Sequence, residues 1–94
     1  MSKPEQGWQV ILHREPDRVL SRLPRQLVKR IWAKIQELKK DPRPNGCVKI
    51  RGTQYDSLYR LRVGDWRISY AIENDQLIVL VLEIAPRGDA YRKF

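Results

Sequence analysis

The sequence predicts an α+β domain in which a two-helix hairpin packs on one face of a small, mostly antiparallel β-sheet, in the order β-α-α-β-β-β. Three observations predict this class. Apolar residues recur at helical spacing in the first half of the chain, and Pro24 divides that helical region in two. From Leu58 onward, short β-prone segments are joined by tight turns. Helices and strands that are segregated along a chain are typical of α+β domains.

The first strand and the first helix occupy residues 8–23. The β-prone run "WQVILH" at residues 8–13 predicts a short strand. In the following "EPDRVLSRL", Pro16 suits the first turn of a helix. The apolar residues that share one face of this helix are Val19, Leu20 and Leu23. Pro24 should end this helix and open the next one.

The second helix is predicted from "PRQLVKRIWAKIQELKK". Its apolar residues form one stripe at helical spacing: Leu27, Val28, Ile31, Trp32, Ile35 and Leu38. We expect Trp32 to pack in the core with the rest of this stripe. The two prolines and the Asn-Gly pair of "DPRPNG" at residues 41–46 should end the helix.

The rest of the chain is predicted to be mainly β. "CVKIRGTQYDS" at residues 47–57 indicates a loop or a ragged strand. "LYRLRV" and "WRISYAI" should form a hairpin with Gly64-Asp65 as its turn. After a second turn at Asn74-Asp75, "QLIVLVLEI" is almost continuously apolar, which is typical of a central strand covered on both faces. Pro86 and Gly88 should end this strand.

Length and charge limit the possible functions. A chain of 94 residues fits one domain, and we expect residues 1–94 to form it. The 19 Lys and Arg residues exceed the 11 Asp and Glu residues, which gives a net charge of +8. An imbalance of this size in so small a domain favours a polyanionic partner.

Cysteine, histidine and hydropathy exclude other classes. Cys47 and His13 are each the only residue of their type, so the sequence predicts neither a disulfide framework nor a zinc site. We expect no metal and no cofactor. The polar start "MSKPEQG" lacks the apolar core of a signal peptide, and the run at residues 77–82 is too short to cross a membrane. We therefore expect a cytoplasmic protein with no membrane partner.

Arginines in the predicted hairpin indicate a phosphate-binding face. Side chains alternate along a strand, so Arg60 and Arg62 share one face of the first hairpin strand. Arg67 lies on the same side of the second strand as the small residues Ser69 and Ala71, which leave room for a groove. If the register brings all three arginines together, the face not covered by helices carries a cationic patch. The hairpin sequence does not fix that register.

The carboxyl-terminal segment "APRGDAYRKF" contains further cations. Arg87 follows the predicted central strand directly, and Tyr91 lies four residues further on. Arg92 and Lys93 come next. Segments that leave the end of a strand often carry functional groups. The alternative is a basic terminus in which Tyr91 serves only as a docking anchor.

Two segments together resemble the RelE/ParE superfamily of toxins from type II toxin–antitoxin systems. "IRGTQYDSLYRLRVGDWRISYAI" resembles that family's glycine-containing loop, its Tyr-Arg-x-Arg-x-Gly-Asp-aromatic-Arg motif and the apolar-Tyr strand that follows. "IAPRGDAYRKF" resembles the closing Pro-Arg-Gly-x-x-Tyr. The resemblance spans nearly the whole chain and implies a RelE-like fold.

For the RelE-like branch, the resemblance implies a metal-independent endoribonuclease that cuts mRNA in the ribosomal decoding site by attack of the 2′-hydroxyl. It implies that Arg67 and Arg87 stabilise the phosphorane, that Tyr91 stacks on or polarises the substrate, and that Arg62 contributes. The residues expected to contact RNA or the ribosome are Arg60, Lys49, Arg51, Arg92 and Lys93. The implied partners are a cognate antitoxin, the ribosome and mRNA.

One departure and two alternatives accompany this interpretation. Some relatives carry lysines where this chain has Arg60 and Arg62, and arginine does not release its proton. The general base is therefore unassigned, and we interpret the nearby Glu83 as an ion-pair partner at a strand end. ParE-like members instead inhibit DNA gyrase through protein contacts, although Arg67, Arg87 and Tyr91 together favour the nuclease. A degenerate homologue that only binds an antitoxin is the third possibility.

Overall fold

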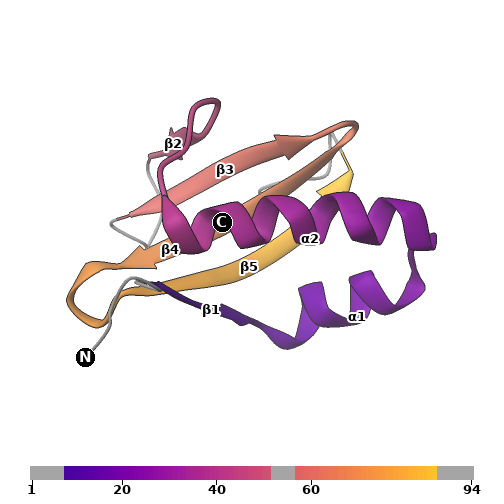
Figure 1. Ribbon diagram of the computed structural model, residues 1–94, viewed down its shortest axis with the longest axis horizontal. Helices are drawn as coiled ribbons and strands as arrows, with labels where there is room; N and C mark the ends of the chain where they lie inside the picture. Colours follow the sequence, from indigo (N-terminus) through magenta and orange to yellow (C-terminus); the bar gives the residue numbers. More distant parts are fainter. Residues whose placement is uncertain (1–7, 52–56, 87–94) are drawn as a thin grey trace.

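The computed structural model describes residues 8–51 and 57–86, which form two helices and a five-stranded sheet. The elements are β1 (Gln9–Leu12), α1 (Arg14–Arg22), α2 (Arg25–Lys40), β2 (Val48–Ile50), β3 (Leu58–Val63), β4 (Trp66–Glu73), a 3-10 turn (Asn74–Gln76) and β5 (Ile78–Pro86). The strand order is β1-β5-β4-β3-β2, and both helices lie on the same side of the sheet (Figure 1). The predicted α+β class is confirmed.

Helix boundaries follow the prolines, as predicted. Pro16 is buried in the first turn of α1, and Pro24 separates the end of α1 from the start of α2. The second helix ends at Lys40, where the backbone N–H of Asp41 donates to the Glu37 carbonyl at 3.0 Å. The Asp41 side chain then accepts a bond of 3.0 Å from the backbone N–H of Arg43, which begins the loop that follows.

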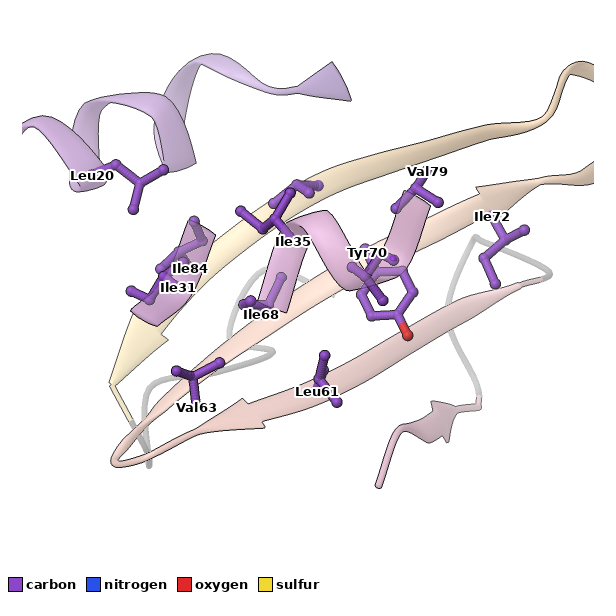
Figure 2. Close-up of a cluster of buried hydrophobic side chains, with 12 residues drawn as sticks. Leu20, Ile31, Ile35, Leu61, Val63, Ile68, Tyr70, Ile72, Val79 and Ile84 are labelled. Atoms are coloured by element: carbon purple, nitrogen blue, oxygen red, sulfur yellow. The ribbon is translucent and has the colours of Figure 1, made fainter. Parts of the chain in front are cut away.

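The main core lies between the helices and the sheet. Ile31, Ile35 and Leu38 of α2 are fully buried, and with Leu20 of α1 they pack on side chains of β3, β4 and β5 (Figure 2). The prediction that Trp32 belongs to this core is wrong, because its side chain is 37% exposed. Each helical residue is rotated by about 100° from the one before it, so Trp32 falls beyond the edge of the stripe that Ile31 occupies.

The apolar strand β5 is an interior strand, between β1 and β4. It pairs antiparallel with β4 and parallel with β1, in a register that places Val10 opposite Val79. Sequence patterning did not identify the partner of β1. A search of the described residues finds no helix long and apolar enough to cross a membrane.

Tyr70 connects the sheet to the loop that follows α2. Its buried hydroxyl donates to the Pro42 carbonyl at 2.8 Å, and its ring stacks on Tyr59 with the centroids 6.0 Å apart. The Arg43 side chain donates from Nε to the Tyr59 hydroxyl at 3.0 Å. Burial and, secondarily, the neighbouring Cys47 side chain raise the pKa of Tyr70. The phenol is therefore held neutral in the folded protein.

Tyr70→Phe should lower the free energy of unfolding by about 1–3 kcal/mol, because the buried Pro42 carbonyl loses its donor. The raised pKa also implies a pH dependence. The neutral phenol stabilises the fold fully below its ordinary pKa of about 10, and this contribution is lost as the pH rises above it. Denaturant unfolding at neutral and alkaline pH checks both effects. A fall at alkaline pH as steep in Tyr70→Phe as in the wild type would contradict the assignment.

Candidate functional site

The register of the β3–β4 hairpin brings the three arginines together. Arg62 lies opposite Arg67, and Arg60 lies opposite Ser69. Directly opposed residues of an antiparallel pair project from the same face of a sheet. Arg60, Arg62 and Arg67 therefore share the face that the helices do not cover, which we call the open face. The sequence had left this arrangement undecided.

Two polar groups on the β4 part of the open face are buried. The Arg67 side chain is half-buried, and its Nε has no hydrogen-bond partner in the structure. Ser69 is fully buried, and its Oγ likewise has no partner. A buried polar group without a partner costs about 1–3 kcal/mol. An external acceptor that reached either group would offset this cost.

Arg60 and Arg62 differ in their surroundings. Burial, and then the positive charge of Arg67, lower the pKa of the half-buried Arg60, although arginine stays protonated in proteins. Arg62 is exposed, and its Nε donates to the Gly64 carbonyl at 3.0 Å. The unfavourable interaction between Arg60 and Arg67 would be relieved by an anion bound near both guanidinium groups.

The remaining predicted site residues do not all join this cluster. Val48 of β2 lies opposite Arg60, whereas Lys49 lies opposite Tyr59 and so belongs to the face that carries the helices. Arg51 is exposed just beyond the end of β2. The other four predicted site residues lie outside the described part of the chain: Arg87, Tyr91, Arg92 and Lys93.

An apolar row crosses the open face beside the arginines, and sequence reasoning missed it. Three of its members are joined by strand pairing, Leu58 opposite Ala71 and Ala71 opposite Leu80. Ile11 of β1 lies opposite Leu80, and Ile50 of β2 lies opposite Leu58. Together with Leu82, most of these side chains form a second, smaller hydrophobic cluster. The alternation of β3 contained the signal, because Leu58 is in phase with Arg60 and Arg62.

Glu83 is a buried carboxylate on the open face. It lies on β5 opposite Ser69 of β4, in the row that also contains Arg60, and it is only 6% exposed. Our interpretation placed Glu83 at the end of a strand, but β5 continues to Pro86. A carboxylate held within a cationic face can accept a proton or orient neighbouring guanidinium groups. Within the ranges 8–51 and 57–86, no group of three or more His, Cys, Asp or Glu residues could hold a metal ion.

Comparison with known proteins identifies the family. The family model described as "ParE toxin of type II toxin-antitoxin system, parDE" matches residues 10–91. This chain belongs to the RelE/ParE toxin family. It is 30% identical over 84 residues to a protein of Methanocaldococcus jannaschii named as toxin RelE1, covering 88% of this chain and 93% of that protein.

Solved structures agree with this RelE/ParE assignment. The archaeal RelE–RelB complex of Pyrococcus horikoshii OT3 is similar with a TM-score of 0.78 and 29% identity, covering 89% of this chain and 99% of that chain. The RelB–RelE complex of Methanococcus jannaschii gives a TM-score of 0.68 at 25% identity, covering 89% of this chain and 98% of that chain. The isolated Escherichia coli RelE toxin gives a TM-score of 0.74 at 15% identity, covering 89% of this chain and 88% of that chain. This likeness supports the fold alone. The RelE-like fold expected for this toxin is confirmed.

Proposed function

We propose that this RelE/ParE family toxin is a RelE-like endoribonuclease that cuts mRNA in the ribosomal decoding site. One observation carries the proposal: Arg60, Arg62 and Arg67 share a face on which the Arg67 Nε and the Ser69 Oγ are buried without partners. Guanidinium groups bind phosphate oxygens in pairs through their N–H donors. The toxin would act in the cytoplasm, where it meets translating ribosomes.

In the proposed reaction, RNA supplies its own nucleophile. The 2′-oxygen attacks the adjacent phosphorus as its proton passes to solvent, and the bond from phosphorus to the 5′-oxygen breaks. The 5′-oxygen leaves with the bonding electron pair and takes a proton from water. Arg67 stabilises the extra negative charge on the phosphate oxygens of the transition state. The family resemblance assigns supporting roles to Arg87 and Tyr91, and positioning of the RNA supplies much of the rate.

The experiment that tests this function is single-turnover cleavage of mRNA on programmed ribosomes, with analysis of the product ends. We expect a 2′,3′-cyclic phosphate upstream and a 5′-hydroxyl downstream. An mRNA with a 2′-deoxy group at the scissile nucleotide should bind without being cut. A product with a 5′-phosphate, or cleavage of the deoxy substrate, would be incompatible with attack by the 2′-hydroxyl.

A second candidate is inhibition of DNA gyrase without nuclease activity. The match to the family model named for ParE favours this function. Induced expression with parallel labelling of protein and DNA synthesis separates the candidates. Early arrest of translation supports the endoribonuclease, and early arrest of replication supports the gyrase inhibitor.

Charge reversal at Arg62 tests whether the open face binds RNA. Arg62 is exposed, so Arg62→Glu should keep the fold while weakening ribosome binding. The variant should release fewer counterions from RNA on binding than the wild type, so its loss of affinity should be larger at low salt than at high salt. Affinity measured over a salt series checks this prediction. Arg22→Glu is the control, because Arg22 is exposed on α1 and belongs to the helix layer. Equal losses in the two variants would show that the open face has no special role.

We further propose that an antitoxin covers the open face. The RelE structures from Pyrococcus horikoshii and Methanococcus jannaschii were solved with RelB. On this chain, the apolar row lies beside the arginines, so the antitoxin segment should present both apolar and acidic side chains. Co-expression with the product of a neighbouring gene should abolish growth arrest. Arrest that persists with every neighbouring candidate would count against this partner.

A further inference from the structure

One arginine of the helix layer, Arg30, reaches the hairpin turn from the side opposite the open face. α2 runs alongside the β3–β4 hairpin (Figure 1), and the Arg30 guanidinium lies against Gly64 in the hairpin turn. A Cβ at Gly64 would lie 3.0 Å from Arg30 Nη2 and 3.6 Å from Arg30 Cζ. Gly64 also has a φ of +60°, which L side chains rarely adopt. Glycine therefore gives this turn both its conformation and the space that Arg30 occupies.

Arg30 and Arg62 meet at the same glycine. The Arg30 guanidinium covers the α-carbon side of Gly64, and the Arg62 Nε donates to the Gly64 carbonyl at 3.0 Å. Both side chains are exposed. Two cations held against one turn repel each other, so an anion bound between or beside them would stabilise their arrangement. We call Arg30 and Arg62 the hairpin-tip pair.

Most donors of the hairpin-tip pair are available to a ligand. Each guanidinium carries five N–H donors. Among the residues that the structure describes, the Arg30 side chain makes no hydrogen bond or ion pair, and the Arg62 side chain donates only from its Nε. Asp65, which follows Gly64 in the turn, forms no ion pair with either arginine. The nearest carboxylate in the sequence therefore does not neutralise the pair.

The hairpin-tip pair is continuous with the proposed catalytic face. Arg62 lies opposite Arg67, so guanidinium groups extend from α2 over the turn to β4. The helix layer is itself basic, because residues 14–40 contain nine Lys and Arg residues and three Asp and Glu residues. A polyanion that crosses the open face at Arg67 and continues past the hairpin turn would therefore meet the further cations of the helix layer.

We propose that the hairpin-tip pair binds the RNA phosphodiester backbone next to the scissile phosphate, and that Arg30 is an RNA-binding residue of this toxin. The inference rests on the proposed ribosome-dependent function. A planar guanidinium can bind a phosphate through two parallel N–H···O bonds, which a lysine at this position could not reproduce. The site is thus suited to a phosphate whose position is fixed by the rest of the bound strand.

The test measures equilibrium binding to ribosomes programmed with mRNA that carries a 2′-deoxy group at the scissile nucleotide. Arg30→Gln should weaken binding roughly tenfold at low salt and reduce the slope of log affinity against log salt by about one. Arg30→Lys should recover only part of the affinity. Lys40→Gln is the matched control, since it removes the same charge from an exposed residue about 15 Å further along α2. Lys40→Gln should bind like the wild type.

The outcomes separate this inference from the proposed function. Equal affinity of Arg30→Gln and Lys40→Gln would overturn the inference alone. Competition by inorganic phosphate as strong as that by RNA, at matched ionic strength, would also overturn it, because the site would then bind simple anions. A wild-type toxin that binds ribosomes but leaves an all-ribose mRNA uncut would overturn the proposed nuclease. The ribosome affinities of Arg30→Gln and Lys40→Gln would then still decide whether Arg30 binds RNA. A wild-type toxin that does not bind ribosomes would overturn both.

Discussion

Replacing Arg67 with alanine should slow single-turnover cleavage of mRNA on the ribosome by about a hundredfold or more, with a much smaller change in affinity. Loss of one preorganised donor to a developing negative charge costs about 3 kcal/mol of transition-state stabilisation. The unpartnered Nε of Arg67 would be such a donor once a bound phosphate reaches it, because no bond within the protein has to be broken first. Rates at saturating toxin, compared with affinities for a 2′-deoxy mRNA, separate the two effects.

Three further variants sharpen the Arg67 result. Arg67→Lys keeps the charge but lacks the Nε–H donor, so it should recover little of the rate. Arg18→Ala removes an exposed cation from α1 and should leave the rate unchanged. Adding Arg87→Ala to Arg67→Ala should slow cleavage further. Full activity of that double variant would exclude the proposed mechanism and make gyrase inhibition the preferred function.

Truncating Ile31 to alanine should lower the free energy of unfolding by about 2–5 kcal/mol, a large part of the stability of a small domain. Ile31 is fully buried between α2 and the sheet, so the truncation removes apolar contacts and leaves a cavity (Figure 2). Denaturant unfolding followed by circular dichroism measures the loss.

Trp32→Ala is the control for Ile31→Ala, because Trp32 is its neighbour in α2 and larger, yet 37% exposed. If burial rather than size decides the cost, Trp32→Ala should be the less destabilising change. A greater loss from Trp32→Ala would mean that the tryptophan contributes to the core after all, as its place in the sequence stripe had suggested.

Local patterns by themselves determined the helices, the hairpin and the candidate residues of this protein. Pro24 fixed the division between the helices because proline cannot continue an α-helix, and the prolines of residues 41–46 fixed the end of α2. Gly64-Asp65 fixed the hairpin turn because a tight turn needs a residue that accepts positive φ. Alternation then grouped Arg60 with Arg62. Each of these signals acts between residues that are close in the sequence.

Only the tertiary structure decided how those elements meet. The two-residue turn at Gly64-Asp65 pairs Arg62 with Arg67, but no local signal gives the register between β2 and β3, so alternation could not place Lys49 on the other face. The parallel pairing of β1 with β5, and the contact of Arg30 with Gly64, join residues far apart in the sequence. Such contacts depend on how the helices and the sheet pack together, which no local pattern encodes. The cationic open face and the hairpin-tip pair are therefore products of packing.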